Sequence, residues 1–253
     1  EGDIMALTRR SEDAVHVEVD QRSDAWFRFR AGEVTGSRAT AMLAKTKSGA
    51  ESSTRRRLKT QLAVERLRIL DDPAWYEQGN VEDFQHGHVT ADMQHGIDTE
   101  PQAREAYRQL LGLEKSSNGV VECGYIRSPY EWVGCSPDGL VGTDGLVELK
   151  CYASHTHVAL LQAGKIPPTV VPQLRHNLFC LPERSYIDFL AYDDRLRKNV
   201  TLWGRRIHRD DPMLDLEGYE QALAVFLEEV ERETEFLRAL PTCTRQDFMG
   251  DTA

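Results

Sequence analysis

The sequence lacks the features of a disulfide-stabilised, secreted or membrane-spanning protein. Its five cysteines among 253 residues are an odd set without a Cys-x-x-Cys pair, which argues against a disulfide framework and a zinc knuckle. No run approaches the roughly 18 consecutive apolar residues of a transmembrane helix. No secretory signal stands at the N-terminus. We therefore expect no membrane span and a reducing, cytoplasmic location.

Charge is distributed unevenly along the chain. The net formal charge of −10 ordinarily speaks against a nucleic-acid partner, because attraction to phosphates supplies most non-specific affinity. Residues 22–70, however, hold twelve Lys and Arg against four Asp and Glu, whereas residues 211–240 hold two against nine. The basic residues of 22–70 could line a channel for a polyanion, while the acidic residues of 211–240 face solvent or a neighbouring subunit. The alternative is that both are ordinary solvated helix faces.

Hydrophobic periodicity predicts helices before and after a central group of strands. Helical spacing of apolar residues indicates helices over 37–45, 55–70, 90–111, 154–164, 172–180 and 216–239. Short β-branched or aromatic runs between turn residues indicate strands over 119–126, 131–135, 145–150, 185–192 and 200–207. Residues 71–88 are expected to be irregular, and Pro101 predicts a boundary or kink in the third helix. The fold class is therefore α/β, a central mixed sheet flanked by helices.

The segment 134–150, GCSPDGLVGTDGLVELK, carries the clearest chemical signal. Asp138 lies at a turn that enters one strand, and Glu148 and Lys150 end the next. Alternate residues of a strand share a face, so Glu148 and Lys150 point together while Leu149 turns into the core, and a hairpin would bring Asp138 beside them. Two carboxylates and the carbonyl of Leu149 form an all-oxygen site suited to Mg²⁺.

Glu148 and Lys150 also interrupt an otherwise apolar run. Acidic and basic residues alternate on many solvated strands, so the spacing alone is a weak signal. Buried ionisable groups, however, are costly and usually have partners or a function. The ammonium of Lys150 could orient or help deprotonate an attacking water, or stabilise the charge that develops on a phosphate.

Motifs in a fixed order along most of the chain resemble the phage lambda exonuclease (YqaJ-like viral recombinase) family of PD-(D/E)xK nucleases. Residues 24–37 are similar to the family's opening, W-x3-R-x-G-x-[VI]-T-[AG]-S. The further motifs lie at 96–104 (GIDTEPQAR), 135–140 (CSPDGL), 146–151 (LVELKC), 172–173 (PQ) and 192–195 (YDDR). The resemblance implies a restriction-endonuclease-like core.

For the metal site, the resemblance implies roles at matching positions. The metal ligands would be Asp138, Glu148, the backbone carbonyl of Leu149 and Glu100. Lys150 would act at the attacking water, and Gln173 would lie beside these groups as a further catalytic residue. Gln173 could instead be a helix-packing residue, since Arg175 stands where the family often has a second glutamine.

For the DNA end, the resemblance implies that Arg30 binds the 5′-phosphate with help from Ser37 and Thr35. A guanidinium suits bidentate phosphate binding, and the turn at residues 35–37 offers free backbone amides at a helix start. Trp26 would pack or stack beside the terminal nucleotide, and Lys47 would contact the DNA backbone. The alternatives are an ordinary surface arginine at Arg30 and a core tryptophan at Trp26.

The implied organisation is one nuclease domain over 5–253, with residues 1–4 interpreted as a remnant of expression. Residues 22–111 would form a helical DNA-end-binding part, 119–210 the catalytic sheet, and 214–240 an acidic C-terminal helix. The implied activity is Mg²⁺-dependent 5′-to-3′ degradation of one strand of linear duplex DNA to 5′-mononucleotides. One or two Mg²⁺ per site would serve, with Mn²⁺ as a substitute.

The same resemblance implies double-stranded DNA ends with a 5′-phosphate as substrate, a homotrimeric ring, and a single-strand annealing protein as partner. The enzyme would be encoded by a phage or prophage and act in the bacterial cytoplasm. Two other functions stay open at this point. The first is a PD-(D/E)xK endonuclease of restriction or repair type. The second is a non-catalytic DNA-end-binding subunit, which the presence of the full acidic and lysine set disfavours.

Histidine pairs at His86 and His88, with Asp83, and at His155 and His157 could in principle bind zinc. Neither pair has the i, i+4 spacing and third ligand of a catalytic zinc site. We therefore do not expect zinc here, and we expect the free cysteines to be small buried packing residues.

Overall fold

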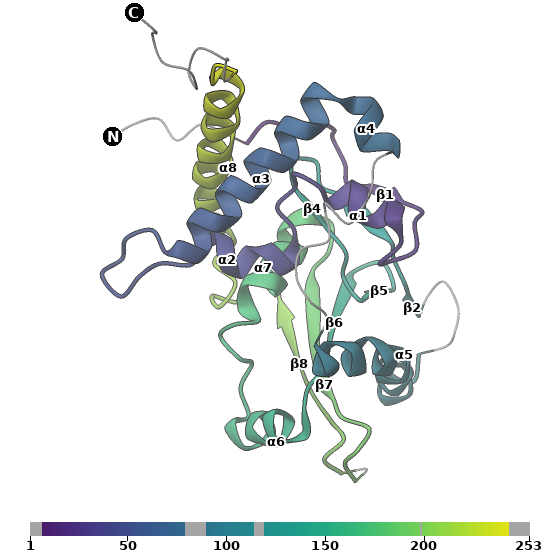
Figure 1. Cartoon of the computed structure of the whole chain (residues 1–253). Coiled ribbons are helices and arrows are strands. Elements are labelled where there is room, and N and C mark those ends of the chain that lie inside the picture. The colour runs from purple at the N-terminus through teal and green to yellow at the C-terminus, as the bar shows by residue number, and fades with distance from the viewer. Residues whose placement is uncertain (1–6, 79–89, 114–118, 198, 243–253) are drawn as a thin grey trace, which may run out of the picture.

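The computed structural model describes residues 7–78, 90–113, 119–197 and 199–242, and a five-stranded mixed sheet forms its centre (Figure 1). The strand order is β2 (Val120–Val121), β5 (Gly139–Val141), β6 (Gly145–Cys151), β7 (Tyr186–Tyr192) and β8 (Leu202–His208). β6 and β7 run parallel, and the other neighbouring pairs are antiparallel. The predicted α/β class with a central mixed sheet is confirmed.

Helices surround this sheet, and a smaller sheet lies beside it (Figure 1). The helices are α1 (Asp24–Arg30), α2 (Gly36–Met42), α3 (Ser53–Asp71), α4 (Pro73–Gln78), α5 (Ala91–Leu111), α6 (Ser154–Ala163), α7 (Val171–Cys180) and α8 (Leu216–Ala239). The smaller sheet has the order β1 (Val15–Val17), β3 (Tyr125–Arg127) and β4 (Gly134–Cys135). In the described part of the chain, no helix is both long and apolar enough to cross a membrane.

Side chains of β6 alternate between two hydrophobic cores, as the period of two of a strand requires. Leu146 belongs to the larger core, which also contains buried residues of α7 and α8. Val147 and Leu149 belong to the smaller core, which contains Ala103 of α5. Glu148 shares the face of Leu146, so its carboxylate points toward α7.

The turn between α1 and α2 is fixed by contacts with α3. Gly32 adopts a positive φ of 71°, and a Cβ there would lie 2.9 Å from the ring of Trp132. Its N–H donates to Glu65 at 2.6 Å, and its carbonyl accepts from Arg66 at 3.0 Å. A side chain at this position would therefore disturb both packing and backbone geometry. The fixed turn brings the end of α1 close to the beginning of α2.

Opposite charges join α3 to α8, which accounts for part of the uneven charge pattern. Arg55 donates to both carboxylate oxygens of Glu229, at 2.6 and 3.1 Å. Lys59 lies 3.5 Å from Glu229, and Thr60 donates a hydrogen bond to Glu233. These basic and acidic groups meet each other within the chain. Arg55, Lys59, Glu229 and Glu233 therefore face each other between two helices. They neither line a channel nor form separate solvated faces.

Several element boundaries differ from the sequence-based expectations. α1 and the early strand β1 were not predicted, and α4 occupies part of the stretch expected to be irregular. The expected strand over 119–126 is two short strands, β2 and β3, in different sheets. The helix boundary at Pro101 was wrong, since α5 continues through it. An ion pair between Glu100 and Arg104 at 2.7 Å spans this point and supports the helix.

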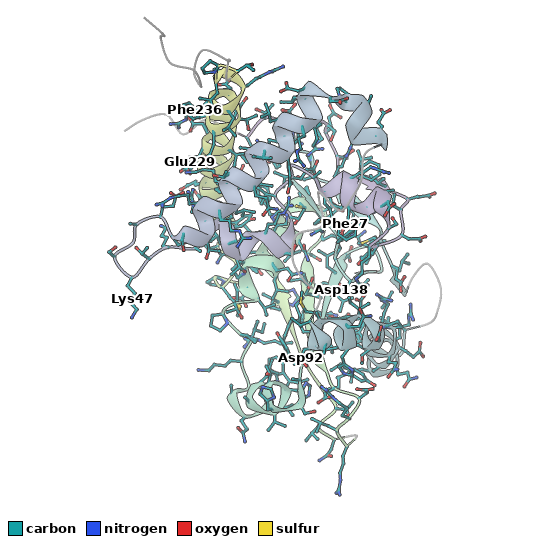
Figure 2. The ribbon with its side chains drawn as sticks, in the orientation of Figure 1. Phe27, Lys47, Asp92, Asp138, Glu229 and Phe236 are labelled. Carbon is teal, nitrogen blue, oxygen red and sulfur yellow. The ribbon has the colours of Figure 1, made fainter. Side chains whose placement is uncertain are left out.

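The packing of α8 on α3 predicts a large loss of stability on Phe226→Ala. Phe226 is fully buried, and the Arg55 guanidinium lies 4.9 Å from its ring centroid. Removing a buried phenylalanine leaves a cavity, so we expect the free energy of unfolding to fall by about 3–5 kcal/mol. Phe236→Ala is the matched control on the same helix (Figure 2), because its side chain is 63% exposed. Equal losses for the two variants in urea unfolding would contradict this packing.

Candidate active site

Both oxygens of the Glu148 carboxylate are held by side chains from β6 and α7. Glu148 is fully buried. Its Oε1 accepts hydrogen bonds from Lys150 Nζ at 2.6 Å and from Gln173 Nε2 at 2.5 Å. Its Oε2 accepts from Asn177 Nδ2 at 3.0 Å. Gln173 and Asn177 are one helical turn apart, so the same face of α7 presents both amides to the carboxylate.

Asp138 lies beside this group, at the turn before β5. Its Oδ2 accepts from the backbone N–H of Leu149 at 2.7 Å, which ties the turn to β6. Burial and the negative charge of Glu148 raise the pKa of Asp138 well above its usual range, and Lys150 offsets only part of this. The predicted hairpin juxtaposition of Asp138 with Glu148 and Lys150 is therefore present.

Glu100 on α5 approaches the same site but is paired with two arginines. Arg22 Nη2 lies 2.9 Å from one carboxylate oxygen, and Arg104 Nη2 lies 2.7 Å from the other. Arg104 is almost fully buried and also donates to the backbone carbonyl of Asp138 at 3.1 Å. Arg104 thereby joins α5 to the turn that carries Asp138.

Arg30, at the end of α1, forms a second polar group with the start of α2. Its Nη2 donates to Ser37 Oγ at 2.8 Å and to Thr35 Oγ1 at 3.3 Å. Its guanidinium carbon lies 3.9 Å from the ring centroid of Trp26, whose Nε1 donates to Ser136 Oγ at 2.9 Å. Among the described residues, no carboxylate lies within ion-pair distance of Arg30. Arg30 is thus a half-buried cation without an anionic partner in that part of the chain.

Burial, and then the nearby charge of Arg38, lower the pKa of Arg30 to about 10. The side chain still carries its charge at neutral pH, but the charge is poorly compensated. An anion beside the guanidinium would relieve this cost, since an opposite charge favours the charged form. The arrangement of Arg30, Thr35 and Ser37 can therefore bind an anionic group through the guanidinium and two hydroxyls.

One pocket of about 610 Å³ joins the two polar groups. Of the predicted site residues, those that line it are Trp26, Arg30, Ser37, Glu100, Asp138, Glu148, Leu149, Lys150 and Gln173. Thr35 is buried just behind Ser37. Lys47 does not line the pocket. It is exposed on the loop between α2 and α3, well away from Asp138 (Figure 2).

The donor set of this pocket fits a hard divalent cation. The carboxylates of Asp138, Glu148 and Glu100 and the backbone of Leu149 line one cavity, and all of them offer oxygen ligands. Burial first, and then the negative charge of Glu148, raise the pKa of Asp138. A cation between Asp138 and Glu148 would supply a positive counter-charge.

Lys150 is a cation in this environment. Burial lowers its pKa, but the negative charges of Glu148 and Asp138 outweigh burial, and the net shift is upward. An ammonium donates hydrogen bonds and stabilises negative charge, but it cannot accept a proton. In the arrangement described here, Lys150 is therefore placed as a hydrogen-bond donor to Glu148.

The sequence also matches the model of the YqaJ-like viral recombinase domain, over residues 25–181. This match covers more than half of the chain. The chain belongs to this family. The predicted resemblance is thereby confirmed, and it extends from α1, through strand β6, to the end of α7.

Solved structures of similar proteins agree with the family assignment. The alkaline exonuclease LHK-Exo from Laribacter hongkongensis is 33% identical, with a TM-score of 0.69 over 85% of this chain and 96% of that chain. LHK-Exo in complex with dAMP is 31% identical, with a TM-score of 0.70 and the same coverages. No curated protein matches the chain.

Some residues of this family member's site were not predicted from the sequence. Asn177 was missed, although it lies four positions after Gln173 and so shares its helix face. Arg22 was missed because it precedes α1, a helix that was itself not predicted. Arg104 was part of a family motif, but no role was inferred for it. Glu100 was expected as a metal ligand, and its pairing with two arginines could not be inferred from spacing.

Of the described histidines, only His155 lines the pocket. His157 is buried with its Nε2 2.9 Å from the Val200 carbonyl, and His155 is exposed at the pocket rim. His86 and His88, with Asp83, lie outside the described residues, and so does Cys243. The buried positions of Cys123, Cys135 and Cys180 fit the expected packing role.

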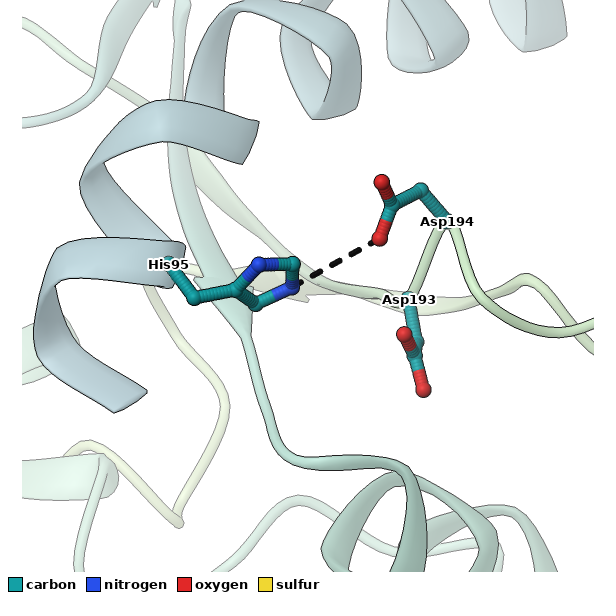
Figure 3. A group of neighbouring side chains, drawn as sticks. All are labelled: His95, Asp193 and Asp194. Atoms are coloured by element: carbon teal, nitrogen blue, oxygen red, sulfur yellow. Dashed lines mark ion pairs between the residues drawn. The ribbon is translucent and has the colours of Figure 1, made fainter. Parts of the chain in front are cut away.

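A different cluster brings His95 of α5 close to Asp193 and Asp194, which follow β7 (Figure 3). His95 Nε2 lies 3.5 Å from Asp194 Oδ1. Asp193 is already paired with Arg195, whose Nε lies 2.7 Å from its Oδ1. A cation bound there would have to compete with this internal guanidinium.

The electrostatics of the pocket predict that Asp138→Asn stabilises the metal-free protein. The raised pKa means that folded Asp138 holds its proton to higher pH than the unfolded chain does, so this group reduces stability as pH rises above about 4. We expect the variant's melting temperature to exceed that of the wild type by a margin that grows from about pH 4 to about pH 8. Thermal unfolding in EDTA at stepped pH measures this, with Asp210→Asn on an exposed turn as control. If the variant and the wild type had the same melting temperature at every pH, the raised pKa of Asp138 would be refuted.

Proposed function

We propose that the chain is a Mg²⁺-dependent exonuclease that degrades one strand of linear double-stranded DNA from the 5′ end. The observation that carries the proposal is the single pocket holding both Arg30, a cation without a carboxylate partner among the described residues, and the Asp138, Glu148 and Lys150 group. An anion site beside a phosphodiester-cleaving group suits a DNA end. The family and the similarity to an alkaline exonuclease support the same reading.

In this proposal, Arg30 and Ser37 bind the terminal 5′-phosphate. Trp26 holds the Arg30 guanidinium by stacking and is itself held by Ser136. Because the Trp26 ring covers the face of the Arg30 guanidinium, the N–H groups at the guanidinium edge can donate to a phosphate. Binding the end at a fixed place sets which phosphodiester lies beside Glu148, so products would be 5′-mononucleotides. The related LHK-Exo was crystallised with a mononucleotide, dAMP.

At the cleavage site, Asp138, Glu148, the Leu149 carbonyl and Glu100 would hold Mg²⁺, with Mn²⁺ as a substitute. When bound, the metal supplies positive charge that activates a water and offsets charge on the phosphate. Glu148 is pre-positioned by its three side-chain donors. Lys150, as a charged donor, orients the attacking water and stabilises the charge that develops on the phosphate. Glu100 would have to exchange Arg22 for the metal or for one of its waters.

Finer aspects of the proposal follow the family resemblance. The chain would act as one nuclease domain in a homotrimeric ring around DNA, and a single-strand annealing protein would receive the 3′ overhang. Lys47, which lies outside the pocket, would contact the DNA backbone away from the cleavage site. The enzyme would be phage or prophage encoded and act in the bacterial cytoplasm.

Lys150→Ala tests the cleavage site. Because the lysine acts on charge that develops during the reaction, we expect kcat on linear duplex with Mg²⁺ to fall at least about 100-fold while DNA affinity changes little. The measurement combines nucleotide release with DNA binding in Ca²⁺. Lys165→Ala, on the exposed turn after α6, is the control. Retained turnover would remove Lys150 from the mechanism.

Arg30→Ala tests the end site. The loss of charge-assisted hydrogen bonds should reduce kcat/KM on 5′-phosphorylated ends by about 10- to 100-fold and leave 5′-hydroxyl ends nearly unchanged. Arg30→Lys keeps the charge but loses the bidentate fork, and its loss should be intermediate. Equal losses on both kinds of end would refute the assignment.

Covalently closed circles, digested in parallel by the wild type, separate the alternative functions. Release of mononucleotides from linear duplex alone indicates the exonuclease. Cleavage of the circles would indicate an endonuclease. Tight binding of ends without any cleavage would indicate a non-catalytic end-binding subunit.

A further inference from the structure

Asn177 lies between the cleavage site and the end site. It is almost fully buried on α7, one turn after Gln173, and it lines the shared pocket. On one side its Nδ2 donates to Glu148 Oε2 at 3.0 Å. The donors from Lys150 and Gln173 both go to Oε1, so Asn177 is the donor that holds the other oxygen of the carboxylate.

On its other side, Asn177 is in contact with the first residue of α2. A Cβ added to Gly36 would lie only 2.8 Å from Asn177 Oδ1 and 3.2 Å from Gln173 Cγ. Only a residue without a side chain allows α2 to approach α7 this closely. Gly36 precedes Ser37, whose hydroxyl accepts from Arg30. The backbone of the end site therefore lies against the Asn177 amide and against the Cγ methylene of Gln173, two side chains that donate to Glu148.

The orientation of the Asn177 amide depends on this contact. Among the described groups, Asn177 Oδ1 has no hydrogen-bond partner, although it is buried. The amide is thus fixed by one hydrogen bond, to Glu148, and by packing against Gly36. A flipped amide would place its oxygen against the carboxylate oxygen of Glu148, which would be repulsive. Any shift of the α2 start must therefore move the amide or open a gap beside it.

We propose that Asn177 is a positioning residue that couples the 5′-phosphate site on α2 to the metal-binding carboxylate Glu148. This inference rests on the proposed function and adds a specific link between its two parts. An end phosphate that draws Ser37 and Gly36 toward Arg30 sets the position of the Asn177 amide. The amide in turn fixes Glu148 Oε2, so correct seating of the DNA end and correct placement of the carboxylate occur together.

The first test removes the amide. Loss of an outer hydrogen bond to a metal ligand typically costs about 10–100-fold in metal affinity or activity. We expect Asn177→Ala to weaken Ca²⁺ binding to the DNA-free protein by about 10-fold, measured by calorimetry. We also expect kcat on 5′-phosphorylated duplex to fall by a similar factor while KM for DNA changes less than about threefold. Asn177→Ser is the second variant if the alanine variant does not fold.

The second test adds a side chain at Gly36, which does not touch Glu148. We expect Gly36→Ala to displace the amide and reproduce the losses of Ca²⁺ affinity and kcat. In the double variant, Gly36→Ala with Asn177→Ala, the closest contact, with Asn177 Oδ1, disappears and only the looser contact with Gln173 Cγ remains, so the combined loss should stay close to that of Asn177→Ala alone. Additive losses would refute the coupling. Leu178→Val, a buried change on α7, is the control, and it should lower stability without altering Ca²⁺ affinity.

The outcomes separate this inference from the proposed function. An inactive wild type that still binds Ca²⁺ would contradict the exonuclease, while the Ca²⁺ data would still test the positioning of Glu148. An active wild type whose Asn177→Ala variant keeps full kcat and full Ca²⁺ affinity would overturn the positioning role and leave the exonuclease intact.

Discussion

The rest of the site depends on the buried Glu148 carboxylate and on the donors that surround it. An isolated buried carboxylate is strongly disfavoured, so the fold must surround it with donors. The ammonium of Lys150 comes from the same strand, and the amides of Gln173 and Asn177 come from one face of α7. The packing of α7 against this sheet face is therefore a requirement of the chemistry as well as of the core. The sheet orients the acid, and the helix holds it.

The acidic groups around Glu148 are balanced unequally, and this imbalance gives the pocket its chemical character. Glu100 forms ion pairs with Arg22 and Arg104. In contrast, burial and the negative charge of Glu148 raise the pKa of Asp138. A cation is therefore most strongly favoured between Asp138 and Glu148. The opposite imbalance exists at Arg30, a half-buried cation that contacts hydroxyls and an aromatic ring and has no carboxylate within ion-pair distance among the described residues. In the proposed function, a phosphodiester end with a bound metal would offset both imbalances at once.

The proximity of several site residues could be predicted because it follows from their spacing within one short segment. The alternation along β6 places Glu148 and Lys150 on one face, and the short hairpin returns Asp138 to them. The contacts that cross between distant elements could not be predicted in this way. The Arg22 pair with Glu100 spans 78 positions, and the Asn177 bond to Glu148 spans 29. Such contacts are set by how α1, α5 and α7 pack on the sheet, which periodicity within one segment does not contain.

The same reasoning explains why charge along the sequence is a poor guide to charge in space. The basic helix α3 and the acidic helix α8 are far apart in the chain, yet Arg55 and Glu229 meet in a bidentate pair. Part of the uneven charge along the sequence therefore serves to join two helices. Arg30, the cation proposed to bind a DNA end, lies in the same basic segment 22–70, but the proposal does not rest on that charge count. Its distinguishing property is a missing carboxylate partner among the described residues, not membership of a basic run. An anion site is found where a buried charge is left uncompensated.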